Sequence, residues 1–97
     1  MRHHLKCRSK EFRAMVEGIK NFDYRVNDRD FKVGDELIEH EVDRDMSETG
    51  DTFTCKVSYI LYGEEFGLPK NACIMSIFGG FLTVPEKSVG KLIEISA

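Results

Sequence analysis

A regular alternation of side chains between residues 52 and 62 constrains the fold more than any other feature of the sequence. The odd positions from Phe53 to Leu61 carry Phe, Cys, Val, Tyr and Leu, whereas Thr, Lys and Ser occupy most of the even positions. A period of two residues is typical of a β-strand that buries one face. A strand of this length, with further extended runs on both sides of it in the chain, is expected to cross the middle of a sheet.

One helix is predicted near the start of the chain. Its apolar residues have the i, i+3, i+4, i+7 spacing of one helix face: Phe12, Met15, Val16 and Ile19. We predict a helix from about Ser9 to Glu17, with Ser9 as its N-cap residue and Gly18 as the C′ residue that ends it.

Further short strands are predicted along the rest of the chain. The extended segments are 3–7, 22–25, 36–42, 72–78, 81–84 and 92–95. In the second of these, Phe22 and Tyr24 share one face, and Asp23 and Arg25 lie opposite them, so this strand has a polar face. In the first, alternation places His4 and Lys6 on the same face.

Turns are predicted where Gly, Asn and Asp cluster. The turn segments are 27–30, 33–35, a charged loop at 43–51 with its tip at 49–51, and Gly79-Gly80. The glycine pair is expected to end the strand at 72–78 as a turn or bulge. The chain of 97 residues fits one domain. One helix against five to seven short strands implies a small α+β fold or a partly closed barrel.

The charge distribution bears on the choice of partner. The formal net charge is −3, which taken alone argues against nucleic acid. However, residues 1–32 hold nine Lys and Arg against five Asp and Glu, whereas residues 33–97 hold five against twelve. This split excludes a broad basic surface for duplex DNA and leaves room for a local basic pocket in the first third of the chain.

The cysteines and the N-terminus bear on location and on metal binding. Cys7, Cys55 and Cys73 are odd in number and form no C-x-x-C pair, which indicates a reducing compartment. The chain lacks a secretory h-region and a run of apolar residues long enough to span a membrane, so we expect a cytoplasmic protein with no membrane partner. His3, His4 and Cys7 lack the paired spacing of a zinc site. We expect no metal and no cofactor.

A charged segment between Gly18 and Asp35 is the richest candidate for a binding site. Its polar residues are Lys20, Asp23, Arg25, Asn27, Asp28 and Arg29. A guanidinium suits phosphate or carboxylate, and an ammonium group adds a point charge. The alternative interpretation is a set of surface ion pairs, with Asx turns at Asn27 and Asp28.

His4 and four phenylalanines each have two possible roles, one in ligand binding and one in the structure. His4 either lies in a pocket together with Lys6 or is a satisfied or solvent-exposed histidine. Four phenylalanines could stack on bases, but with ten aromatic residues in the chain we expect core packing for each of them: Phe31, Phe66, Phe78 and Phe81.

The order of these residues resembles a known family. The pattern is His4-x-Lys6, a helix closed by Gly18, and then G-x-K-x-x-D-x-R-x-N-D-R-x-F-x-x-G-D up to Asp35; the segments 57–61, 66–69 and 74–76 also match. It is similar to the ASCH branch of the PUA-like superfamily, and within it to a small domain of unknown function found in bacteria and phages. The resemblance covers residues 3–78, and we expect residues 79–97 to add closing strands.

The resemblance implies a mixed β pseudo-barrel with the helix covering one opening, and RNA or a nucleotide bound in the cleft beside that helix. It implies that Lys20, Asp23 and Arg25 occupy the family motif, with Asn27, Asp28 and Arg29 at its exit. Phosphate would then meet Lys20, Arg25, Arg29 and Lys6, and a base or ribose would meet Asp23, Asn27 or His4. Asp23 replaces the usual glutamate and is one methylene shorter.

Two alternatives to simple binding stay open. Some small ASCH proteins hydrolyse the acetyl amide of acetylated cytidine with a lysine and a threonine. Lys20 matches their lysine and Asp23 stands at the threonine position, so Lys20 would be the base or nucleophile, Asp23 would orient it, and Glu64 or Glu65 would supply a remote carboxylate. The other alternative is an acidic face between residues 36 and 51 that binds a basic protein through Glu39, Glu41, Asp43 and Asp45.

Overall fold

The structure, a computed structural model, describes residues 1–85 and shows an α+β fold with one helix and one five-stranded sheet. The elements are β1 (Arg2–Arg8), α1 (Ser9–Val16), β2 (Phe22–Val26), β3 (Glu36–Val42), β4 (Glu48–Tyr62), a 3₁₀ turn η1 (Glu65–Gly67) and β5 (Ala72–Thr83). The sheet order is β1-β3-β4-β5-β2, which confirms that the alternating run forms the central strand. The predicted strand at 92–95 lies outside the described residues.

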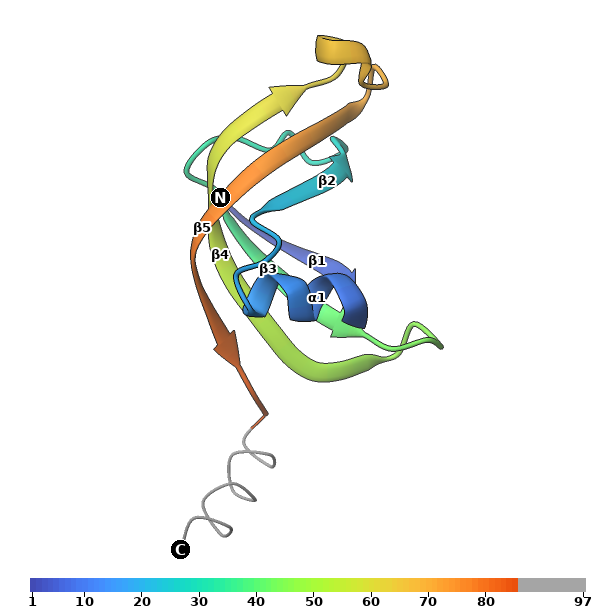
Figure 1. Ribbon diagram of the computed structural model, residues 1–97, viewed down its shortest axis with the longest axis vertical. Helices are drawn as coiled ribbons and strands as arrows, with labels where there is room; N and C mark the ends of the chain where they lie inside the picture. Colours follow the sequence, from blue (N-terminus) through green and yellow to red (C-terminus); the bar gives the residue numbers. More distant parts are fainter. Residues whose placement is uncertain (86–97) are drawn as a thin grey trace, which may run out of the picture.

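The sheet is mixed and strongly curled. Strand β1 pairs with β3 in parallel, and the other neighbours are antiparallel. Figure 1 shows the long strands β4 and β5 bending around α1, which lies on the concave side. The two edge strands of the order, β1 and β2, are brought toward one another by this curl because the twist of each strand accumulates across the sheet.

Helix α1 begins at Ser9 as predicted and ends at Val16, one residue earlier than predicted, and its N-cap residue differs from the prediction. Arg8, not Ser9, is the N-cap residue, and no side-chain hydrogen bond caps the helix. The Ser9 hydroxyl instead donates to the carbonyl oxygen of Val42 on β3 (3.1 Å) and fixes the helix start to the sheet. Gly18 has a φ of +76° and its N–H donates to the Met15 carbonyl, which confirms the predicted C′ glycine.

The alternation along β4 changes phase at a bulge. Phe53, Cys55 and Val57 face the core as predicted, but the pairing with β5 shifts between Val57 and Tyr59. After the shift Ile60 is buried, whereas Tyr59 is 62% exposed. The side-chain pattern predicted Tyr59 on the buried face and was wrong there, because one extra residue in a strand reverses which side chains point inward.

The Gly79-Gly80 pair forms a bulge within β5 and does not end the strand, which continues to Thr83. Thr54 pairs with Phe81 and Lys56 with Phe78, so β5 carries one more residue than β4 between these pairs. A Cβ atom at Gly80 would lie 1.9 Å from the Phe53 ring. Glycine is required here because the ring packs directly against the backbone.

Two further predictions differ from the structure. The loop after β3 turns at residues 44–46, and the predicted tip at residues 49–51 belongs to β4. Of the four phenylalanines assigned to the core, Phe31 is buried and Phe66, Phe78 and Phe81 are exposed. The buried apolar cluster is instead completed by thiols and aliphatic residues, among them Cys7, Cys55, Cys73, Leu37 and Met75. No helix within residues 1–85 is long and apolar enough to cross a membrane.

The close contact at Gly80 gives a test of the bulge. Gly80→Ala is expected to lower the free energy of unfolding by about 1–3 kcal/mol, because the added methyl group overlaps the Phe53 ring. Urea unfolding followed by circular dichroism measures the loss. The same substitution in a Phe53→Leu background should cost less, and an equal cost in both backgrounds would contradict the contact.

Candidate functional site

A polar cleft of about 290 Å³ lies where α1, β1 and β2 meet. Its charged lining consists of four cations and two acids: Lys6, Arg8, Lys20, Arg25, Glu11 and Asp23. Strand β1 supplies Lys6 and, as its last residue, Arg8, and Lys20 lies in the coil between α1 and β2. The structure therefore brings together four of the predicted site residues, Lys6, Lys20, Asp23 and Arg25.

The guanidinium of Arg25 forms the floor of this cleft. Its Nε group donates to both carboxylate oxygens of Asp23 at 3.1 Å. Its Nη2 group donates to Oε1 of Glu39 at 2.7 Å and to the carbonyl oxygen of Lys6 at 3.0 Å. The polar face of β2 thus points inward, and the aromatic face with Phe22 and Tyr24 is half-exposed. Arg25 links β2 to β3 and β1, neither of which pairs with β2.

Glu39 adds a second carboxyl group to this cluster and is completely buried, with an exposed fraction of 0%. Burial, followed by hydrogen bonding and repulsion from Asp23, raises the pKa of Glu39 from 4.5 to about 9, although Arg25 acts in the opposite direction. The Glu39 side chain therefore holds a proton at neutral pH. The proton on Glu39 lowers the net negative charge buried around the one guanidinium of Arg25.

Arg25 uses its donor groups for contacts within the protein, so the other cations of the cleft are the ones that can contact a ligand. Lys6 and Arg8 are exposed and Lys20 is half-buried. Among residues 1–85, none of these three side chains forms an ion pair. Lys20 Nζ lies 5.3 Å from the centre of the Phe22 ring, within the range of a cation–π interaction. Three positive charges are thus available to an anion in the cleft.

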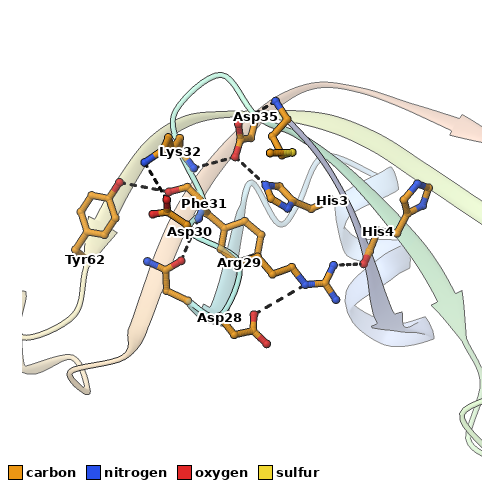
Figure 2. Close-up of polar contacts among 11 residues, drawn as sticks. His3, His4, Asp28, Arg29, Asp30, Phe31, Lys32, Asp35 and Tyr62 are labelled. Atoms are coloured by element: carbon orange, nitrogen blue, oxygen red, sulfur yellow. Dashed lines mark hydrogen bonds and ion pairs between the residues drawn. The ribbon is translucent and has the colours of Figure 1, made fainter.

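The residues after β2 have a different role from those in the cleft. Figure 2 shows the Arg29 guanidinium pointing at the carbonyl oxygen of His4, to which Nη1 donates at 2.6 Å, with Asp28 3.9 Å from Nε. Asn27 Oδ1 accepts from the backbone N–H of Phe31 and shapes the loop. None of the three, Asn27, Asp28 or Arg29, lines the cleft.

Two arginines therefore occupy the free edge of β1. Arg25 binds the Lys6 carbonyl and Arg29 binds the His4 carbonyl. These carbonyls belong to alternate residues of the strand, which point to the same edge, away from β3. The curled sheet is closed on this side by side-chain donors in place of a main-chain ladder, and the same contacts shield an exposed strand edge from pairing with another chain.

His4 belongs to a surface chain of hydrogen bonds outside the cleft lining. Its Nδ1 atom lies 2.8 Å from Nε2 of His40, and Nδ1 of His40 lies 3.1 Å from Oε1 of Glu48. Within residues 1–85, His, Cys, Asp and Glu side chains form no group of three or more that could hold a metal ion.

A buried ion-pair cluster around Asp35 was not predicted from the sequence. Its Oδ2 atom bonds Nε2 of His3 at 2.8 Å and the backbone N–H of Lys32 at 2.9 Å, and the N-terminal ammonium lies 3.3 Å from Oδ1 (Figure 2). Burial acts to raise the pKa of Asp35, but these contacts outweigh it and hold the pKa below its ordinary value. The sequence does carry a signal for the inward position of His3. In an alternating strand His3 lies on the same face as Leu5 and Cys7, which are apolar and therefore expected to point inward.

The acidic segment between residues 36 and 51 does not form one exposed face. Glu39 is buried under Arg25, and Glu41 is also buried, where it accepts a hydrogen bond from the Thr49 hydroxyl at 2.8 Å. A basic protein could therefore contact only Asp43 and Asp45 of the four predicted acids. The prediction that Glu39 and Glu41 belong to an exposed acidic face is wrong.

The fold and site together define a class of small one-helix α+β domain, in which a curled sheet places a cationic cleft over a buried arginine–carboxyl cluster. Residues 2–77 match the family model described as Domain of unknown function (DUF3850), and the chain belongs to that family. No curated protein matches the sequence.

The protonated state of Glu39 predicts a pH dependence of stability. The folded state keeps a proton that the unfolded chain releases near pH 4.5, so this contribution to stability declines as the pH rises from about 5 toward 9. Glu39→Gln, which keeps the shape of the protonated acid, should remove the decline. Urea unfolding at several pH values measures it, with the exposed Glu64→Gln as control. A slope in Glu39→Gln equal to that of the wild type would contradict the assignment.

Loss of the guanidinium should have a larger effect. Arg25→Met is expected to lower the free energy of unfolding by about 3–5 kcal/mol, because it leaves the Asp23 carboxylate buried without its counter-charge. Arg29→Met, at a more exposed position of the same β1 edge, serves as the comparison and should cost less. Equal losses in thermal or urea unfolding would show that the Asp23–Arg25–Glu39 cluster is not the stronger contact.

Proposed function

We propose that this domain binds a nucleotide, or a nucleotide unit of RNA, in the cleft between α1, β1 and β2. The observation that carries this function is the group of three cations, Lys6, Arg8 and Lys20, which face one small cleft without an ion-pair partner in residues 1–85. Phosphate is the ligand group that such a cluster of donors binds most strongly. The cleft volume of about 290 Å³ suits one nucleotide unit better than a duplex.

In this proposal the residues of the cleft have separate roles. Lys6, Arg8 and Lys20 contact phosphate oxygens, and Arg25 fixes the floor. The carboxylate of Asp23, held by two hydrogen bonds from Arg25, keeps acceptor capacity for a ribose hydroxyl or a base amino group. The local positive field of these cations, and not the net charge of −3, determines that the cleft attracts a negatively charged ligand.

We further propose that the DUF3850 domain is an ASCH-type member of the PUA-like superfamily. The motif from Gly18 to Asp35 supports this, as does the curled sheet with a helix at its concave side. RNA binding is the activity for which PUA-like domains are mainly known, which agrees with the cationic cleft at the position of the motif.

Hydrolysis of a modified nucleoside is the second candidate. Lys20 and Asp23 line the same cleft, as the resemblance to the acetylcytidine amidohydrolases requires. Neither Glu64 nor Glu65 lines that cleft, and Glu65 instead accepts a hydrogen bond from the backbone of Tyr62. Incubation with acetylated cytidine and chromatography for cytidine separates the candidates: product formation that is lost in Lys20→Ala establishes the hydrolase, and no product leaves binding.

The binding proposal predicts the effect of removing single cations. Lys20→Ala and Lys6→Ala should each weaken binding of uridine monophosphate by roughly tenfold, the value of one charge-assisted hydrogen bond. Isothermal titration calorimetry measures the affinity, which should also fall as salt is added.

The control for this experiment is Lys70→Ala, which removes an exposed lysine from the loop between β4 and β5 and should leave affinity unchanged. Affinity that is insensitive to salt and unchanged in both Lys6→Ala and Lys20→Ala would refute the cleft as a phosphate site.

A further inference from the structure

The outer face of β2 and its neighbours exposes an unusual number of aromatic rings. Phe22 and Tyr24 on β2 and Tyr59 on β4 are each between 47% and 62% exposed. The bulge in β4 turns Tyr59 outward, and the inward contacts of Asp23 and Arg25 force the two β2 rings outward. A solvent-exposed group of large rings on a sheet face marks an interaction surface more often than an accident of packing.

The register places these rings around a small polar floor. Phe22 pairs with Ser76 on β5, and Ser76 pairs with Tyr59 on β4, so one serine separates the two rings across three strands. The Ser76 and Ser58 hydroxyls lie 2.7 Å apart on this floor. Two strand spacings, about 9.5 Å, separate the backbones that carry the rings. We call this arrangement of Phe22, Tyr59 and the two serines the aromatic slot.

The side chains next to the aromatic slot on β2, β4 and β5 are uncharged or basic, and the neighbouring acid Glu36, which pairs with Lys56 in the sheet register, forms its ion pair with Arg2. The side chains that the register places around it on the outer face of β2, β4 and β5 include no acid: Phe22, Tyr24, Ser58, Tyr59, Leu61, Ile74 and Ser76. Lys20 lies against the Phe22 ring, and Lys56 is exposed two residues before Ser58 on β4. Neither lysine has an ion-pair partner within the part of the chain that the structure describes.

A surface groove runs between the cleft and the Phe22 ring at one end of the aromatic slot. It runs along α1, is lined by Ala14, Ile19, Lys20 and Phe22, and has a volume of about 450 Å³. Lys20 and Glu11 border both the groove and the cleft. A chain-like ligand that leaves the cleft past Lys20 therefore arrives at the Phe22 ring.

We propose that the aromatic slot binds a base of single-stranded nucleic acid whose neighbouring nucleotide occupies the cleft. This inference rests on the proposed function and extends the ligand from one nucleotide to an oligonucleotide. Rings stack on bases of any sequence, the serine hydroxyls donate to or accept from base edges, and the two lysines meet the flanking phosphates. A second copy of this chain fits less well, because a two-fold contact would bring the same unpaired lysines to the same face.

The test compares a mononucleotide with an oligonucleotide. Phe22→Ser and Tyr59→Ser should each weaken binding of a fluorescein-labelled oligouridylate by roughly five- to a hundredfold in fluorescence anisotropy. Binding of uridine monophosphate, measured by calorimetry, should not change in Tyr59→Ser, because Tyr59 does not line the cleft. Phe22→Ser also removes the ring beside Lys20, so Tyr59→Ser is the variant that carries this comparison. Phe66→Ser, which replaces a ring that is 92% exposed on η1 and distant in sequence from β2, is the matched control and should leave both affinities unchanged.

Three outcomes separate this inference from the function on which it rests. Wild-type affinity for the oligouridylate in both Phe22→Ser and Tyr59→Ser overturns the aromatic slot and leaves the cleft proposal standing. A wild-type dimer in sedimentation velocity that Tyr59→Ser dissociates, without loss of oligouridylate binding, also overturns it in favour of a second copy. Loss of oligouridylate binding in the slot variants, with uridine monophosphate binding insensitive to salt and unaffected by both Lys6→Ala and Lys20→Ala, supports the aromatic slot and refutes the cleft.

Discussion

The contact on which the rest of the structure depends is the guanidinium of Arg25. It joins β2 to β3 and β1, two strands with which β2 shares no main-chain hydrogen bonds. Arg25 is held between Asp23 and the protonated Glu39, so the face of β2 that points into the sheet is polar. The alternate residues Phe22 and Tyr24 therefore lie on its outer face. The floor of the cleft and the outward orientation of Phe22 and Tyr24 follow from this buried ionic cluster, which also holds β2 against β1 across the curled sheet.

The main elements of the fold could be predicted from side-chain periodicity. The helix, the central strand and the bounds of β3 agree with the local pattern, since each depends on residues close in sequence. The two bulges could not be predicted in this way. At Tyr59 the phase of the pattern changes without any glycine or proline to mark it, and at Gly80 the need for glycine comes from the ring of Phe53 on another strand.

Part of the candidate site could also be predicted, because some of its residues follow a local sequence pattern. The motif between Gly18 and Asp35 and the parity of Lys6 identified four residues that the cleft brings together. The separation of Arg29 from that cleft depends on a carbonyl group of β1, to which the local sequence gives no clue. Glu39 was assigned to an exposed acidic face, because its partners lie on β2 and a glutamate is rarely buried.

The burial of the three cysteines has a consequence for the chemistry of the folded chain. Burial raises the pKa of Cys7 and Cys55 to about 12 and also raises that of Cys73, so all three thiols stay protonated, and each residue is at most 5% exposed. A maleimide or an oxidant therefore reacts slowly with these thiols in the folded chain, and faster when β1, β4 or β5 separates from its neighbours. The rate of thiol alkylation therefore reports how often the interior of the sheet opens, without any substitution or attached label in the protein.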